Sequence, residues 1–447
     1  MPFHMDSSRA SIDRSFWPGQ RAVPSSSYSR ESLLSRTNLY RAEISNGVVS
    51  DVLADTQNRL PDEFKIPADL RAPIEFWLKI YSVYSTHQLV LFDSHHPEVI
   101  YEVLDFRELA EKSRNRAAYE ITRRKLEKRA IAAYRKAFQK LSKKGQAKSQ
   151  DPYPTREELN IVRAISGVEH GHPVSFFAKH FRTQTGQRDN VIRGLNAIEP
   201  FLETMERVFS EHGLPPELTR LSLVESSFNF RAFSKAGAAG VWQFIPKSGK
   251  EFLTINPQYR IDERLSPIKS TVAAARLLTR NQTIFRNWPM TVASYHSGLV
   301  RLIRVPKRHR TDEHLDKIFG SCSQRGILGW AGKNYYSEFI ALLHADRYQD
   351  WLYGKVNVGR TASVAFKRME QPDTLTGFAL RRGYSYMDLR KLNPDVQDCQ
   401  RVLPMGFMVA TPAQSPDEPL GLKVGRPLAP GPRKLLSSNK DDREEMS

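Results

Sequence analysis

Cysteine is scarce in this sequence, with two thiols among 447 residues. Cys322 and Cys399 lack the close paired spacing of cysteines that bind zinc, so no cysteine-based metal site is expected. The two thiols could pair in an oxidising compartment or both stay free, and the sequence does not choose between these states.

Long apolar runs are also missing. No stretch approaches the roughly 18 to 20 apolar residues that cross a bilayer, and the first residues lack the apolar core of a signal peptide. Either a leader is absent from this sequence or export is not encoded in it. With 40% hydrophobic residues and mixed charge, the chain is expected to form two or three globular domains with flexible ends.

Acidic residues are outnumbered, because 49 Asp and Glu face 67 Lys and Arg and leave a formal net charge of +18. Nucleic acid, an anionic membrane and an anionic cell-wall polymer would all suit such a charge. Much of the excess lies between residues 107 and 148, where 15 Lys or Arg face 4 Glu. The spacing of apolar residues there predicts one long helix over about 106–141. Its aromatic stripe is expected to pack on the catalytic domain, and its charge to give a weak, salt-sensitive attraction to anionic polymers.

Two adjacent histidines, His95 and His96, stand before Pro97 between two β-rich runs. Imidazoles bind transition metals, but no third ligand lies nearby in the sequence, so a polar turn is the favoured interpretation. We therefore predict no metal site and no cofactor.

The most informative stretch runs from residue 213 to residue 244 and reads GLPPELTRLSLVESSFNFRAFSKAGAAGVWQF. Its two prolines suit the start of a helix. Leu214, Leu218 and Leu221 follow the i, i+4, i+7 spacing of a buried helical face, and the next position on that face is Glu225. Burial disfavours the ionised form of a carboxyl group and should raise its pKa, as a general acid working near neutral pH requires.

The residues that follow Glu225 are suited to binding a sugar. Ser226 offers a small hydrogen-bonding side chain, and the glycines farther on allow backbone to approach a ligand closely. Trp242 offers an apolar face, with the amide of Gln243 beside it. The stretch therefore looks like a sugar site beside a buried acid.

ELTRLSLVESSFN followed by AGAAGVWQFIP resembles the catalytic core of the lytic transglycosylases with a lysozyme-like fold, most closely the membrane-bound murein transglycosylase D group. FRTQTGQRDNVIRGL, from residue 181, extends the resemblance upstream. The resemblance implies that Glu225, followed by Ser226, is the single catalytic acid and base. It also matches the family's Gly-x-x-Gln block to residues 240–243.

Two later blocks resemble the family with departures. The Ala-Tyr-Asn-x-Gly block, whose Tyr and Asn line the sugar cleft, keeps Tyr295 but places His296 where the Asn stands. An imidazole titrates near pH 6.5, so a protonated His296 in the cleft would lower the pKa of Glu225; alternatively, His296 only fills space between helices. Tyr335 occupies the place of the Tyr that reaches the catalytic Glu, although the usual Glu-Thr before it is absent. The predicted substrate-binding residues are Ser226, Trp242, Gln243, Tyr295, His296 and Tyr335.

We predict a mainly α fold with a lysozyme-like catalytic domain. After residue 353, a strand, two helices and a strand are expected within about 50 residues, an order that resembles a degenerate LysM glycan-binding module; the alternative is a small α+β extension that only covers the catalytic domain. The predicted divisions are a disordered arm (1–60), an accessory segment with the long basic helix (61–155), the catalytic domain (156–352), the LysM-like module (360–413) and a disordered tail (414–447).

The resemblance implies cleavage of the MurNAc-GlcNAc β-1,4 bond of peptidoglycan with formation of 1,6-anhydro-MurNAc ends. Peptidoglycan strands, and not nucleic acid, are the expected partner of a monomer in the periplasm or associated with the cell envelope. Two alternatives stay open. One is a lysozyme-type hydrolase in which Asp262 or Glu263 helps water to attack, since glycosidases ordinarily use two acidic groups. The other is a catalytically inactive peptidoglycan-binding protein.

Overall fold

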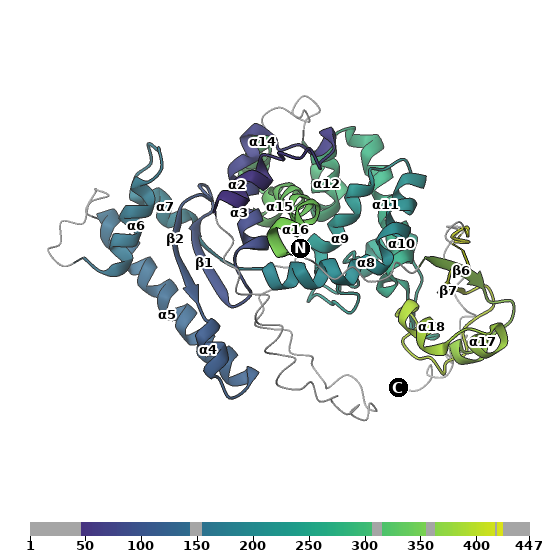
Figure 1. Cartoon of the computed structure of the whole chain (residues 1–447). Coiled ribbons are helices and arrows are strands. Elements are labelled where there is room, and N and C mark those ends of the chain that lie inside the picture. The colour runs from purple at the N-terminus through teal and green to yellow at the C-terminus, as the bar shows by residue number, and fades with distance from the viewer. Residues whose placement is uncertain (1–45, 144–153, 306–314, 355–362, 416–417, 423–447) are drawn as a thin grey trace, which may run out of the picture.

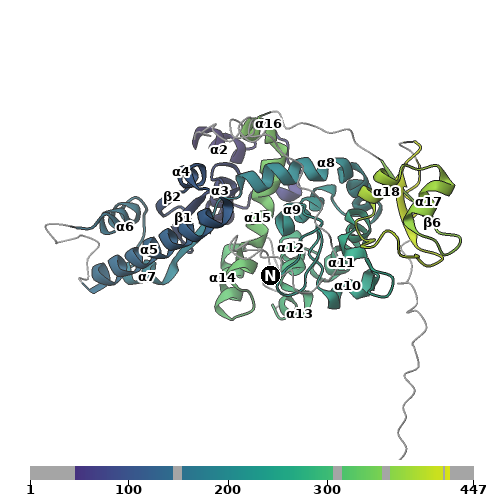
Figure 2. The same ribbon diagram turned by 90° about the horizontal axis from the view of Figure 1, so that it is seen from below.

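The computed structural model describes residues 46–143, 154–305, 315–354, 363–415 and 418–422. The described chain is mainly α, as predicted, with three small antiparallel sheets. It forms a central body (46–85 and 186–354), an N-terminal lobe (86–185) and a C-terminal module (363–422), which lie in a row with the central body in the middle (Figures 1 and 2).

The central body is organised around α15, Trp330–Arg347, which is buried along most of its length and packs against α3, α9 and α12. Helix starts here carry the expected signals: the side chain of Asn287 caps α12 and that of Ser266 caps α11, each followed by a proline in the first turn. The helices of the body are α2 (Asn46–Leu53), α3 (Arg71–Ser82), α8 (Arg188–Glu211), α9 (Leu221–Ser226), α10 (Pro246–Phe252), α11 (Pro267–Phe285), α12 (Trp288–Ser297), α13 (Leu299–Leu302), α14 (Leu315–Gln324), α15 and α16 (Gln349–Tyr353).

Helix α2 corrects the predicted extent of the N-terminal arm. Val49, Val52 and Leu53 on this helix are buried in the same cluster as α15, and the Nδ1 of His344 on α15 lies 2.9 Å from the carbonyl oxygen of Val52. Residues 46–60 are therefore part of the central body. The rest of the predicted arm, residues 1–45, lies outside the described residues.

The N-terminal lobe is a three-stranded sheet of order β2-β1-β3 covered by helices. Its strands are β1 (Gln88–Asp93), β2 (Ile100–Asp105) and β3 (Phe181–Thr185), and its helices are α4 (Arg107–Lys112), α5 (Arg116–Lys143), α6 (Arg156–Ser166) and α7 (Val174–His180). The predicted long basic helix is thus interrupted between α4 and α5. Its aromatic stripe, with Tyr134 and Phe138, packs on Tyr101 and Phe181 of the lobe's own sheet and not on the central body, which contains the predicted catalytic motif.

The predicted start of the catalytic domain at residue 156 is wrong, because the chain from there to residue 185 belongs to the N-terminal lobe. Helices α6 and α7 bury Ile161, Ile165 and Phe177 in the hydrophobic cluster of the lobe. Strand β3 then pairs with β1, with Leu91 opposite Thr183, so the chain leaves the lobe only after residue 185. Conversely, α3 of the predicted accessory segment packs in the central body against α15.

The C-terminal module has the predicted order of strand, helix, helix and strand: β6 (Val364–Arg368), α17 (Leu375–Arg382), α18 (Tyr386–Leu392) and β7 (Met408–Pro412). The two strands pair antiparallel, with Phe366 opposite Ala410. The predicted tail begins later than residue 414, because Leu420 is buried and its carbonyl oxygen accepts a hydrogen bond of 2.8 Å from the backbone N–H of Phe366.

Buried charges dock the module on the central body. Lys269 of α11 places its Nζ 2.7 Å from Asp395 Oδ2 and 3.1 Å from Glu263 Oε1, and the Asp395 side chain is fully buried. Backbone pairing continues the contact, since the N–H of Asp262, in the short strand β5 (Ile261–Asp262) that pairs with β4 (Ile255–Asn256), donates to the carbonyl oxygen of Asp395 at 2.9 Å. Removing one partner of such a pair would leave an uncompensated buried charge at this contact.

Candidate active site

Glu225 lies at the end of α9 and points into the protein. The prolines before it begin a short 3-10 helix that leads into α9, and Leu214, Leu218 and Leu221 are buried as their spacing predicted. Glu225 continues that face with 4% of its surface exposed. Ser227 ends the helix in the left-handed region at φ 50°, so the chain turns away immediately after the carboxyl group.

Burial raises the pKa of Glu225 to about 7, against the opposing effect of a hydrogen bond from Tyr335. The Tyr335 hydroxyl donates to Glu225 Oε1 at 2.6 Å. Because burial and the nearby carboxylate hold the pKa of Tyr335 well above its usual value, its hydroxyl stays protonated and remains a donor. A carboxyl group with a pKa near 7 can give up a proton and take one back at neutral pH, as an acid/base catalyst must.

His296 and Tyr295 lie beside this pair on α12. The His296 ring stacks on the Tyr335 ring, with centroids 4.9 Å apart and planes 21° from parallel. The Tyr295 hydroxyl donates to the carbonyl oxygen of Trp242 at 2.7 Å and so ties α12 to the loop after α9. The structure thus brings Tyr335 to Glu225 and stacks His296 on Tyr335, and contact of His296 with sugar stays a prediction.

The loop at residues 237–244 is held close to Glu225 by backbone contacts. Gly240 has φ 75°, and a Cβ there would meet the Arg264 carbonyl oxygen at 1.8 Å, so only glycine fits. The Ser226 hydroxyl is 3.1 Å from the Val241 carbonyl oxygen, and the Gln243 Nε2 donates to the Gly240 carbonyl oxygen at 2.7 Å. Gln243 Oε1 is buried and has no hydrogen-bond partner among the described residues, so this predicted substrate-binding amide keeps a free acceptor.

The prediction that Trp242 contacts substrate with its side chain is wrong. The indole is fully buried, stacks on Phe209 at 5.6 Å and donates from Nε1 to Thr271 Oγ1 at 2.8 Å. Trp242 therefore supports the site from the core through its backbone carbonyl, which receives the Tyr295 hydroxyl. The aromatic residue looked like a sugar platform only because the sequence does not show which side of the loop faces the core.

A pocket beside Glu225 includes a second carboxyl group that the sequence interpretation missed. Its lining joins Glu225 and Ser226 to Trp77 and Tyr81 of α3, Gln184 of β3 and Glu338 of α15. Gln243, Tyr295 and His296 lie outside this lining. Two walls of the pocket thus come from chain that precedes the predicted catalytic motif.

Burial and the charge of Glu225 raise the pKa of Glu338 to about 8, although a hydrogen bond from Tyr81 opposes the shift. The Tyr81 hydroxyl is 3.3 Å from Glu338 Oε2. Glu338 is therefore largely protonated at neutral pH. The signal was available in the sequence, because Glu338 is an acidic residue in an apolar helix, three positions after the Tyr335 predicted to reach Glu225.

The acidic residues proposed as a second catalytic group are engaged elsewhere. Asp262 makes a two-pronged ion pair with Arg264, with distances of 2.9 and 2.8 Å, and Glu263 contacts Lys269. Both serve the junction between the central body and the C-terminal module. They have structural partners and lie outside the lining of the pocket.

We expect Glu338→Gln to reduce the dependence of folding stability on pH. The folded state holds the Glu338 proton up to about pH 8, whereas an unfolded Glu releases it near its ordinary pKa of 4.5. Stability contributed by the protonated group is therefore lost as pH rises between these values, at up to about 1.4 kcal/mol per pH unit. Urea unfolding at pH 5, 6.5 and 8 measures the free energy of unfolding of parent and variant. If this free energy changes with pH equally in both proteins, the raised pKa of Glu338 is contradicted.

Comparison with known proteins agrees with this arrangement. Residues 209–317, which include Glu225, Gln243, Tyr295 and His296, match the family model described as Transglycosylase SLT domain. The chain is 32% identical over 133 residues to the "Membrane-bound lytic murein transglycosylase D" of two Escherichia coli strains, K12 and O6:H1. That stretch is 30% of this chain and 28% of each relative. The chain is also 34% identical over 109 residues to a "Putative tributyltin chloride resistance protein" of Alteromonas. This match covers 24% of the chain and 52% of the relative.

Proposed function

We propose that this protein is a peptidoglycan lytic transglycosylase that cleaves the MurNAc-GlcNAc β-1,4 bond and leaves 1,6-anhydro-MurNAc ends. The observation that carries the proposal is the buried Glu225 carboxyl group, whose pKa of about 7 is accompanied by a hydrogen bond from Tyr335. The SLT domain that contains Glu225 and the relatives named lytic murein transglycosylase support the same activity.

Glu225 would act twice in one turnover. As an acid, it protonates the glycosidic oxygen as the bond from C1 breaks, while the N-acetyl group of the substrate stabilises C1. The carboxylate then takes the proton of the C6 hydroxyl as that oxygen bonds to C1, which returns Glu225 to its protonated form. No water is consumed, so one residue that can hold and release a proton near pH 7 is sufficient.

This mechanism suits the site better than hydrolysis does. An inverting or retaining glycosidase needs an ionised second carboxylate as base or nucleophile. Asp262 and Glu263 are held in ion pairs, and the Glu338 carboxyl group, with a pKa of about 8, is protonated at neutral pH. The described residues around Glu225 thus lack an ionised second carboxylate poised for that role.

Peptidoglycan strands are the proposed partner, and the cell envelope, with the periplasm as its expected compartment, is the proposed location. The two Escherichia coli relatives are named membrane-bound, whereas the helices of the described residues are each too short or too polar to span a bilayer. The C-terminal module keeps the predicted role of a LysM-like glycan binder, supported by its strand, helix, helix, strand order.

Mass spectrometry of the muropeptides released from purified sacculi tests the proposal. We expect products with 1,6-anhydro ends, which borohydride does not reduce. Reducible MurNAc ends would identify a hydrolase instead. Protein that pellets with sacculi but releases no soluble fragments would identify a binding protein without activity.

A further inference from the structure

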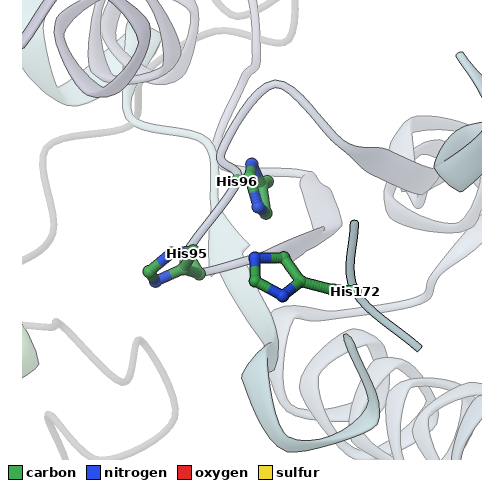
Figure 3. Close-up of side chains that lie close together, drawn as sticks. All are labelled: His95, His96 and His172. Carbon is green, nitrogen blue, oxygen red and sulfur yellow. The ribbon is translucent and has the colours of Figure 1, made fainter. Parts of the chain in front are cut away.

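Three histidines from distant parts of the sequence come together in the N-terminal lobe. His95 and His96 lie in the turn between β1 and β2, and His172 lies in the segment before α7 (Figure 3). One ring nitrogen of each lies within 4.8 Å of those of the other two. The sequence favours a simple polar turn because no third ligand lies near His95 and His96 along the chain. The fold brings His172 to them as a third possible ligand.

These nitrogens are close to the spacing that a metal ion needs. In a tetrahedral zinc site with Zn–N bonds of about 2.0 to 2.1 Å, the nitrogens are about 3.3 Å apart. His95 and His172 are exposed, so rotation of their side chains can close the remaining distance without disturbing the core. The His172 ring is stacked on Phe176, with centroids 3.8 Å apart.

The surroundings of His96 are those of a metal ligand. Its Nδ1 lies 3.2 Å from Glu98 Oε1, and in the tautomer that carries its proton on Nδ1 the ring donates to this carboxylate and leaves the Nε2 lone pair free. Nε2 is buried and has no hydrogen-bond partner among the described residues. A carboxylate behind a ligating imidazole is the usual outer partner in zinc sites, because it fixes the tautomer and makes the free nitrogen more basic.

The turn that carries His95 and His96 is held in place by a buried acid. Asp93 Oδ1 accepts hydrogen bonds of 2.8 Å from the backbone N–H groups of both histidines. His180 is a further neighbour, with its ring 5.3 Å from that of His95 and with Nδ1 positioned to donate to the Phe176 carbonyl oxygen.

We propose that His95, His96 and His172 bind one divalent transition-metal ion of the zinc class, with His180 or water in the fourth position. Three imidazoles suit zinc, nickel and copper, and not magnesium or calcium, which prefer oxygen ligands. The ion would join the β1–β2 turn to the segment before α7. A pocket lined by His95 and by Lys333, Asn334 and Ser337 of α15 adjoins this position, so the ion would lie where the lobe faces the central body.

Zinc titration of a protein without a polyhistidine tag, after removal of metals with EDTA, tests the site. We expect one Zn²⁺ per chain by calorimetry, and bound Co²⁺ should show the intense visible absorption of a tetrahedral site. His172→Ala should weaken zinc binding at least about tenfold, the loss that even an outer-sphere partner causes. The triple variant His95→Ala/His96→Ala/His172→Ala should abolish it.

The matched control is His212→Ala, which removes a histidine at the end of α8, outside the cluster. This variant should bind zinc as the parent does. The proposal is overturned if the triple variant binds zinc as tightly as the parent, or if the parent binds none. Far-UV circular dichroism of each variant shows whether any loss of binding comes from unfolding.

Discussion

Glu225→Gln is expected to slow glycan cleavage by about 10²- to 10⁴-fold, the usual contribution of a positioned general acid and base. Glutamine keeps the size of the side chain and can still accept the Tyr335 hydrogen bond at Glu225 Oε1, but it carries no transferable proton. Because burial disfavours the ionised carboxyl group, the variant should be at least as stable as the parent at pH 8. Release of soluble muropeptides from sacculi measures the rate.

The pH dependence of the parent protein provides a second test of the role proposed for Glu225. Glu225 must be protonated to act first as an acid, so activity should fall as pH rises through about 7, its pKa in the folded protein. The matched control is Glu251→Gln, which changes an exposed residue of α10 that pairs with Arg280. It should keep the parent rate and pH profile. Normal digestion by Glu225→Gln would remove the basis of the proposed function.

Lys269→Met is expected to destabilise the protein by about 3 to 5 kcal/mol, because it removes the cation from a buried ion pair and leaves Asp395 uncompensated. Asp395 is fully buried, and Lys269 also lies 3.9 Å from the centre of the Phe407 ring in the C-terminal module. The loss of stability should affect mainly the contact between the C-terminal module and the central body. Urea unfolding measures its size, and limited proteolysis shows whether the module separates first.

A change on the same helix provides the comparison. Arg280→Met removes an ion pair with Glu251 in which the side chains are 40% and 50% exposed, so we expect a loss of about 1 kcal/mol or less. Adding Asp395→Asn to Lys269→Met should recover part of the stability, because the unpaired buried charge is then gone. Equal losses for the Lys269 and Arg280 variants would show that the buried pair does not hold the module.

Local spacing in the sequence was sufficient to locate Glu225, because a helical stripe of leucines determines which way the next residue on that face points. The same reasoning was insufficient for Trp242, since a loop has no period that separates its core side from its ligand side. Residues that meet only through the fold were harder still. Glu338 is 113 positions from Glu225, and His172 is 76 positions from His96.

Packing partners were the second thing that spacing could not provide. An aromatic stripe on α5 predicts that another element covers this side of the helix. The expected partner was the catalytic domain, whereas the stripe packs on strands β1 to β3 of its own lobe. The sequence likewise placed α3 in the accessory segment, whereas this helix packs against α15 in the central body. Element types were therefore more predictable than the boundaries between the parts of the molecule.

The walls of the Glu225 pocket extend beyond the stretch that matches the family model. That stretch is residues 209–317, yet the pocket is also lined by Tyr81 from before it and by Glu338 from after it. The matched stretch and the complete pocket are therefore different units. A fragment limited to residues 209–317 would carry Glu225 without these two walls, so any shortened form of this protein has to keep α3 and α15 if the acid is to stay enclosed.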